Sequence, residues 1–282
     1  MNATAPAKAP QFSTITEQPG QPASRDQLAM LAARYAWAAA YAAGRDVLEV
    51  ACGAGLGLGA LAQVARIVEA GDLDEANLSA ARRAYFCDKR INLRALDAMR
   101  LPYRDESFDL VLLFEALYYL PSAVKFFHEA QRVLRPGGRL LIATVNREWS
   151  GFNPSPFHTH YLSASELRWS LEESGYTVEL QVGFPEPPSA FSSAIGGLRR
   201  AAVALNLVPR TMRGKALLKR LFYGRLNPVP ARIELQPSPN RDREGAGSPS
   251  PQNTLHSLAA LDASTDLTRY RVLYAAARKD FS

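Results

Sequence analysis

The chain has 282 residues, of which 47% are apolar and 21% charged, as is usual for a globular protein with a full core. No apolar run approaches the about 20 residues that a membrane-spanning helix needs, and the N-terminal residues lack the apolar stretch of a secretory signal. The only cysteines, Cys52 and Cys87, are too few for a disulfide framework or a metal-ligand cluster. These features predict a cytoplasmic, reduced setting and no metal site.

The net charge of +6 belongs to one segment of the chain. Residues 187–233 contain nine Lys and Arg and no Asp or Glu, and removing those nine leaves 24 basic residues against 27 acids. The stretches 198–205 and 215–222 within this segment are amphipathic. The sequence therefore predicts a helical basic insertion whose chemistry differs from that of the rest of the chain.

The predicted elements follow in chain order. Residues 1–25 are expected to be a disordered arm, 26–184 a core, 185–235 the basic insertion, 236–253 a disordered linker, and 254–282 a segment that returns a final strand to the core. Helices are predicted over 27–43, 61–65, 125–134 and 165–174 and from residue 74 onward, and strands over 47–50, 67–71, 91–96, 110–114, 139–145, 176–182 and 270–275. This alternation predicts an α/β fold with a doubly wound, mostly parallel, seven-stranded Rossmann-like sheet, interrupted by the insertion before its last strand.

A glycine turn follows the first predicted strand. Residues 47–59 read VLEVACGAGLGLG, in which glycine occupies positions 53, 55, 57 and 59 before helical character resumes. Glycine lets the backbone approach a ligand closely, and the free N–H groups of the next helix favour negative charge or lone pairs. Strand, glycine turn and helix together indicate a nucleotide-binding sheet.

Several motifs in this order resemble those of class I S-adenosylmethionine-dependent methyltransferases of the methyltransferase type 11 kind. They are the glycine turn with Glu49, Asp72 after the second strand, Asp97-Ala98 after the third, Ser107-Phe108-Asp109 before the fourth, and the Arg132–Gly138 turn before the fifth. The resemblance implies an enzyme that uses S-adenosyl-L-methionine. The cofactor-binding residues that it implies are Glu49, Ala51, Gly53, Gly55, Gly57, Asp72, Leu73, Asp97, Ala98, Phe114 and Glu115.

Two alternatives stay open at this stage. Gly55, Gly57 and Ala60 also fit the G-x-G-x-x-A pattern of NAD(P)-dependent oxidoreductases, although Asp97-Ala98 has no role in that class. The second alternative is a scaffold that binds the cofactor without catalysis. Ala51 occupies a position where the methyltransferase family often has glycine, so the backbone there must accommodate a Cβ atom.

The predicted acceptor is a small molecule or a glycan that is methylated at oxygen, and methylation of a small metabolite or quinone at carbon stays open as an alternative. The long loop 149–161 lies after the fifth predicted strand and contains His158 and His160, either of which could act as a general base. Alternatively, both histidines only fix the loop. The basic insertion suggests an anionic acceptor or peripheral contact with an anionic membrane surface, or is a solvated face of a lid. Nucleic acid is not an expected partner, and the sequence predicts no oligomeric state.

Overall fold

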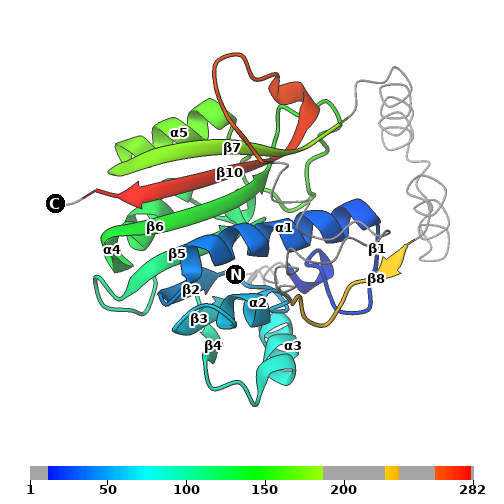
Figure 1. Ribbon diagram of the computed structural model, residues 1–282, viewed down its shortest axis with the longest axis vertical. Helices are drawn as coiled ribbons and strands as arrows, with labels where there is room; N and C mark the ends of the chain where they lie inside the picture. The colour runs from blue at the N-terminus through cyan, green and yellow to red at the C-terminus, as the bar shows by residue number, and fades with distance from the viewer. Residues whose placement is uncertain (1–11, 187–225, 235–257, 281–282) are drawn as a thin grey trace, which may run out of the picture.

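The computed structural model describes residues 12–186, 226–234 and 258–280 (Figure 1). Three predictions fall wholly or partly outside these ranges: the first eleven residues of the arm, most of the basic insertion (187–225), and the linker at 236–253.

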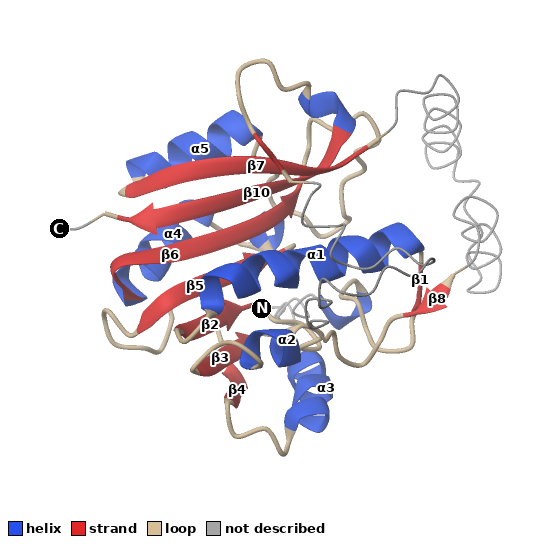
Figure 2. Ribbon diagram, viewed as in Figure 1, coloured by secondary structure: helices blue, strands red, loops and turns tan. Residues whose placement is uncertain are grey.

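The core is one eight-stranded sheet (Figure 2). Its strands lie in the order β4 (Ile91–Ala95), β3 (Ile67–Asp72), β2 (Asp46–Val50), β5 (Phe108–Phe114), β6 (Leu134–Val145), β10 (Tyr270–Lys279), β7 (Tyr176–Pro185) and β9 (Ala259–Ala260). Strands β4 to β6 are mutually parallel, and β10 is antiparallel to both β6 and β7. The predicted fold class is therefore confirmed, with the two-residue strand β9 added at one edge.

Helices cover both faces of the sheet. Helices α1 (Arg25–Ala42), α2 (Leu58–Ala62) and α3 (Glu75–Tyr85) pack on one face, and α4 (Ala123–Val133) and α5 (Ala164–Glu173) on the other. Alternate residues of each central strand feed the two cores: Leu110 and Leu112 face α1, whereas Val111 and Leu113 face α4. Within the described ranges, none of the helices combines the length and apolarity needed to cross a bilayer.

Local signals explain where the helices begin. Ser24 and Ser163 each form a capping box, with Gln27 and Glu166 respectively, and the Asp74 carboxylate accepts from the Ala76 N–H. Several boundaries differ from the prediction by a few residues, and the start of β6 differs by five, because β6 begins at Leu134, directly after α4. The Pro-Gly-Gly sequence that was expected to form a turn before the strand therefore lies inside it.

Residues 12–24 are ordered against the core, which differs from the predicted disordered arm over that stretch. The segment contains a 3₁₀ turn, η1 (Phe12–Thr14), and strand β1 (Pro22–Ala23), which pairs with β8 (Asn227–Pro228). Polar contacts hold it in place: the Ser13 N–H donates to the Asp74 carboxylate at 2.8 Å, and the Gln18 amide donates to Asn77 at 2.8 Å.

The residues that follow the basic insertion also return to the core. Val229 and Ile233 are buried, and the Ile233 N–H donates to the carbonyl of Leu56 in the glycine turn at 2.7 Å. At the other end of the insertion, the Glu186 N–H donates to the carbonyl of Arg269 at 2.7 Å. Both described flanks of the insertion are thus fixed to the sheet domain.

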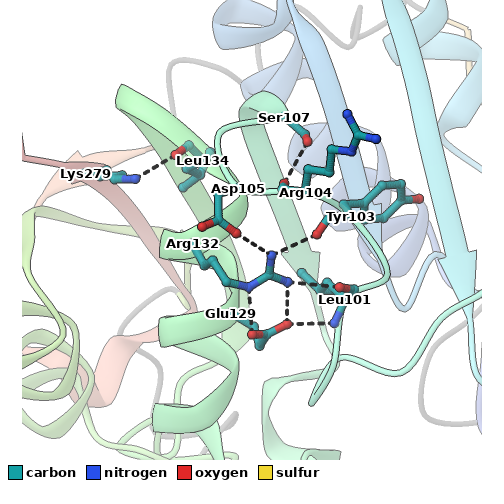
Figure 3. A network of polar contacts seen from close by, with 9 residues as sticks. All are labelled: Leu101, Tyr103, Arg104, Asp105, Ser107, Glu129, Arg132, Leu134 and Lys279. Carbon is teal, nitrogen blue, oxygen red and sulfur yellow. Dashed lines mark hydrogen bonds and ion pairs between the residues drawn. The ribbon is translucent and has the colours of Figure 1, made fainter.

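One polar network fixes the loop between β4 and β5 (Figure 3). Arg132, on α4, donates to both oxygens of the Glu129 carboxylate and to the carbonyl oxygens of Leu101 and Tyr103. Glu129 in turn accepts from the Leu101 N–H at 2.8 Å. The network holds the residues that directly follow Asp97 and Ala98.

Candidate cofactor and acceptor site

A cavity of about 1100 Å³ opens at the carboxyl ends of the parallel strands. Its walls come from the ends of β2, β3 and β5, the first half of α1, and residues 12–17. Ligands of open α/β sheets bind at this end of the strands. The topology alone therefore identifies this cavity as the candidate site.

The glycine turn forms the floor of the cavity, and two of its residues have special conformations or contacts. Ala51 adopts a left-handed backbone with φ of 56°, which residues other than glycine rarely take. At Gly57, an added Cβ atom would lie 2.1 Å from the ring of Tyr35. The turn therefore needs glycine at position 57 because the ring of an α1 residue packs directly on it.

Glu49 is buried beneath the turn. Its Oε1 accepts a 2.7 Å hydrogen bond from the Tyr35 hydroxyl, whereas its Oε2 is buried without a partner. Burial raises the pKa of Glu49 from 4.5 to about 7, against the opposing effects of the Tyr35 hydrogen bond and of Arg34. An acceptor without a donor at the base of a cavity is suited to a cationic ligand group.

Arg34 is a second buried group with unused hydrogen-bonding capacity. Its Nη2 donates to Glu17 at 3.3 Å, its Nη1 lies 3.9 Å from Glu115, and its Nε has no partner. The side chain is 7% exposed, so water does not replace the missing contact freely. An α-amino acid group carries an ammonium and a carboxylate, which match the unpaired atoms of Glu49 and Arg34.

Asp72 ends β3 and faces the same cavity. One of its oxygens accepts from the Gly53 N–H and the other from the Asp74 N–H, both at 2.8 Å. Burial raises its pKa, while these backbone N–H groups act in the opposite direction. The oxygen that accepts from Asp74, Oδ1, also accepts from the Asn77 amide at 3.3 Å, so Oδ2 is the oxygen that keeps a free lone pair for a ribose hydroxyl.

Asp97 and Ala98 lie beyond the end of β4. Asp97 is exposed, and its Oδ1 accepts from the Met99 N–H at 2.8 Å, whereas Ala98 is buried. Leu73 lines the cavity nearby with 65% of its side chain exposed. The Asp97 carboxylate, the buried backbone of Ala98 and the exposed apolar side chain of Leu73 together suit a flat nitrogen base.

The four acids follow the order of the strands. Asp97 lies after β4, Asp72 at the end of β3, Glu49 near the end of β2, and Glu115 directly after β5. Neighbouring strands are about 4.8 Å apart, so the acids form a line along one edge of the sheet. An elongated ligand with a base, a ribose and an amino acid group fits this line.

A family profile described as Methyltransferase domain matches residues 48–142, which include the glycine turn and the strands from β3 to most of β6. The chain contains a methyltransferase domain. This domain carries Glu49, Asp72, Asp97 and Glu115, and therefore the whole line of acids.

Curated proteins that are similar to this domain are named as methyltransferases. A probable S-adenosylmethionine-dependent methyltransferase of Mycolicibacterium smegmatis is 42% identical over 147 residues, 50% of this chain and 55% of the relative. One from Mycobacterium tuberculosis is 38% identical over 138 residues, 47% of this chain and 48% of the relative. The match thus spans about half the length of these curated relatives.

Solved structures share the fold of the methyltransferase domain. The crystal structure of the cyclase SpnF has a TM-score of 0.57 and 19% identity, and the match covers 94% of this chain and 86% of that one. At this identity the likeness concerns the fold alone, and the chemistry must be argued from the site.

Most of the predicted cofactor residues line the cavity. The structure brings nine of them to its wall, namely Glu49, Ala51, Gly53, Asp72, Leu73, Asp97, Ala98, Phe114 and Glu115. Gly55 and Gly57 instead shape the turn behind the wall, where they pack against Tyr85 and Tyr35 respectively.

The two predicted catalytic histidines do not line the cavity, although Phe157 and Thr159 beside them do. His158 is exposed, and its Nδ1 contacts the carbonyl of Ser155 within the same loop. His160 is exposed as well. A general-base role for either histidine stays an untested prediction.

The sequence reasoning missed Glu17, Arg34 and Tyr35 as site residues. Arg34 and Tyr35 belong to an alanine-rich helix. The one signal that the sequence offered there is a charged residue beside an aromatic residue within an otherwise apolar stretch. Glu17 gives no local signal, because its contact with Arg34 depends on how residues 12–18 cross the cavity.

Proposed function

We propose that the protein binds S-adenosyl-L-methionine and transfers its methyl group to a hydroxyl oxygen of a small-molecule or glycan-type acceptor. The observation that carries the proposal is the line of acids from Asp97 through Asp72 to Glu49, which ends at Glu115. Each part of the cofactor has a matching group along that line.

The fit can be followed from one end of the cofactor to the other. The adenine would lie by Asp97 and Ala98, the ribose hydroxyls by Asp72, and the ammonium by Glu49. The carboxylate would face Arg34, whose Nε is buried without a partner. Since nine of the eleven charged residues that line the cavity are acids, the wall also favours a ligand with a sulfonium cation.

When bound, the cofactor supplies an electrophilic methyl group on a positively charged sulfur. The protein's own contribution is to orient the reactants and exclude water, which accounts for much of the acceleration in a displacement of this kind. The side chains of Phe12, Tyr118, Tyr119 and Phe157 line the cavity and would help to exclude water from it.

Two relatives support a small-molecule acceptor. A 27-O-demethylrifamycin SV methyltransferase of Amycolatopsis mediterranei is 38% identical over 104 residues, and a demethylmenaquinone methyltransferase of Clavibacter sepedonicus is 38% identical over 105 residues. These matches cover 38% and 43% of the two relatives. The name of the first relative is the observation that favours oxygen as the methylated atom.

Calorimetric titration with S-adenosylmethionine, S-adenosylhomocysteine and NADH tests the cofactor part of the proposal. We expect both sulfur compounds to bind and NADH not to bind; binding of NADH alone would favour an oxidoreductase. Release of S-adenosylhomocysteine during incubation with candidate acceptors then separates a methyltransferase from a scaffold that only binds the cofactor.

The basic insertion carries a second, separate proposal of peripheral contact with an anionic membrane surface. Its support is the sequence of residues 187–233, which has nine basic residues and no acid. Co-sedimentation with vesicles of phosphatidylcholine, with and without phosphatidylserine, tests it. Binding that needs the anionic lipid and falls with salt would support the contact, and equal recovery in both supernatants would contradict it.

A further inference from the structure

We propose that Glu115 is the general base of the methyl transfer and that the acceptor it deprotonates is an uncharged hydroxyl compound. The inference rests on the proposed function and names the substrate class and the catalytic residue of the same site. Sequence reasoning had placed Glu115 among the cofactor-binding residues instead.

The strand order places Glu115 at the acceptor end of the cavity. In the proposed cofactor position the adenine, ribose and amino acid groups would lie at the ends of β4, β3 and β2 in turn, and the methyl group would lie toward the next strands, β5 and β6. Glu115 directly follows β5, and Trp149 follows β6. Both side chains line the cavity, as does Arg271 of β10.

The backbone fixes Glu115 in an unusual conformation. Its φ of 51° lies in the left-handed region, and its N–H donates to the carbonyl of Ala143 on β6 at 2.8 Å. Such strain costs about 1–3 kcal/mol and persists where a site requires a particular side-chain direction. A glycine at position 115 would remove this strain, yet the chain has a glutamate there.

Three groups surround the Glu115 carboxylate. Tyr118, on the turn η2 (Leu117–Tyr119), donates from its hydroxyl to Oε2 at 3.0 Å, and the Arg34 guanidinium lies 3.9 Å from Oε1. Glu17 pairs with the same guanidinium from the other side. Burial raises the pKa of Glu115, and Arg34 and Tyr118 oppose the rise. With 29% of its side chain exposed to the cavity, Glu115 can reach a ligand.

The charges around the acceptor end indicate an uncharged compound. Among the described residues, the cavity is lined by two cations, and both already face carboxylates: Arg34 faces Glu17 and Glu115, and Arg271 faces Asp26 and Glu186 at 2.8 and 3.0 Å. A phosphate or carboxylate on the acceptor would therefore meet more acids than bases. This favours an uncharged acceptor over the anionic one expected from the basic insertion.

Apolar and aromatic side chains provide the rest of the acceptor's surroundings. Phe12, Met30, Tyr119, Trp149 and Phe157 line the same cavity as Glu115. Aromatic faces bind both flat apolar groups and sugar rings, so these side chains select an acceptor by its shape. The acids of the cavity wall then disfavour an acceptor with a negative charge.

The proposed reaction transfers the methyl group to the acceptor's oxygen. The acceptor's hydroxyl proton moves to Glu115, and the electron pair that is freed on oxygen forms the bond to the methyl carbon. The carbon–sulfur bond breaks and sulfur keeps its electron pair, which gives a methyl ether and S-adenosylhomocysteine. The Glu115 carboxyl then returns its proton to solvent. A base positioned in this way contributes about 10²–10⁴-fold in rate.

Calorimetry with S-adenosylhomocysteine tests the position of Glu115 without an acceptor. We expect Glu115→Gln to bind within about threefold of the wild type and Glu49→Gln to bind at least about tenfold more weakly. If Glu115→Gln loses as much affinity as Glu49→Gln, then Glu115 is a cofactor ligand and the inference fails. If the wild type itself does not bind, the proposed function fails instead.

Paired probes then test the acceptor class on the protein loaded with S-adenosylhomocysteine. 4-Methylphenol and methyl glucoside are uncharged at pH 7, and their phosphate esters are matched anions. We expect at least one uncharged probe to bind about tenfold or more tightly than its ester, and Glu115→Gln to weaken it about tenfold. Tighter binding of the esters, binding of no probe, or the same affinity in Glu115→Gln would overturn the proposal.

Turnover of an uncharged probe gives a second readout. In the wild type, kcat should rise with pH as Glu115 ionises and then level off. In Glu115→Gln, kcat should be lower and should lose this rise with pH, while the KM for S-adenosylmethionine stays within about threefold of the wild-type value. Glu115→Asp should recover part of the rate. A kcat unchanged in Glu115→Gln would exclude the base role.

Discussion

The Tyr35 hydroxyl donates a 2.7 Å hydrogen bond to the buried carboxylate of Glu49, and the Tyr35 ring covers Gly57 of the glycine turn. One side chain of α1 thus orients the acid beneath the turn and defines the space above it. The Tyr35 hydroxyl contacts only Oε1, so Oε2 of Glu49 has no hydrogen-bond partner. Burial raises the pKa of this carboxyl to about 7. A cationic ligand beside Oε2 would therefore stabilise the ionised form of Glu49, which burial in the protein disfavours.

Glu49→Gln should increase the stability of the ligand-free protein at alkaline pH. Because the pKa of Glu49 is raised from 4.5 to about 7 on folding, the folded state binds the proton more tightly than the unfolded state. The wild type therefore loses stability between about pH 4.5 and 7, whereas the glutamine variant does not. We expect the variant to gain about 1–3 kcal/mol at pH 8 and little at pH 4.5, as measured by urea unfolding.

The same carboxyl should make cofactor affinity depend on pH. An ammonium group favours the ionised form, so S-adenosylmethionine should bind the wild type more tightly as pH rises from 5.5 to 7.5 and change little above that. Glu49→Gln should bind weakly at every pH. Parallel pH profiles in the two proteins would show that Glu49 does not face the ammonium.

Gly57→Ala should disrupt the site through Tyr35. Its Cβ would lie 2.1 Å from the ring, and Tyr35 can move only by giving up its hydrogen bond to Glu49. We expect a loss of about 2–4 kcal/mol in unfolding free energy and of cofactor binding. Gly20→Ala serves as a control for glycine replacement away from the cavity, because no atom lies within 4 Å of its added Cβ. Its φ of 79° strains an alanine, so it should cost about 1 kcal/mol in stability but leave cofactor binding unchanged.

Ala51→Gly should stabilise the protein. Ala51 has φ of 56°, and a left-handed conformation costs a residue with a Cβ about 1–2 kcal/mol, of which the greater unfolded-state entropy of glycine cancels a part. We expect a net gain of about 0.5–1 kcal/mol. Gly53→Ala is the matched opposite, since Gly53 also has φ of 56° and an added Cβ would lie 2.7 Å from Thr16. Stabilisation by both substitutions would contradict the backbone argument.

Arg132→Met should loosen the loop that carries the adenine end of the site. The substitution leaves the carbonyls of Leu101 and Tyr103 and the Glu129 carboxylate without the guanidinium (Figure 3). We expect a loss of about 1–2 kcal/mol in stability and weaker binding of S-adenosylhomocysteine. Arg82→Met removes an exposed ion pair with Glu75 and should cost less than about 0.5 kcal/mol. Equal effects of the two variants would argue against a specific role for the network.

The sheet could be predicted because its signals are local. Continuous apolar runs such as 110–114 define buried parallel strands, and the strand ends then place Asp72 and Asp97 on one edge. Residues 12–18 could not be predicted in the same way. Their contacts join Ser13 to Asp74, 61 residues away, and no pattern within the segment indicates them.

The acceptor end was harder to predict for a different reason. Residue type alone favoured His158 and His160 as bases, but the direction of a loop side chain depends on tertiary packing, and both are exposed outside the cavity wall. Glu115 carried no such signal, because its position depends on a left-handed backbone after β5. More of the predicted residues therefore line the cavity at the cofactor end than at the acceptor end.

The most direct measurement is a crystal structure of the protein grown with S-adenosylhomocysteine. We expect adenine beside Asp97 and Ala98, the ribose hydroxyls on Asp72, the ammonium facing Glu49, and the sulfur on the side of Glu115. A structure in which the ligand lies in the reverse direction, or in which Glu115 contacts the ribose or adenine, would contradict this expectation.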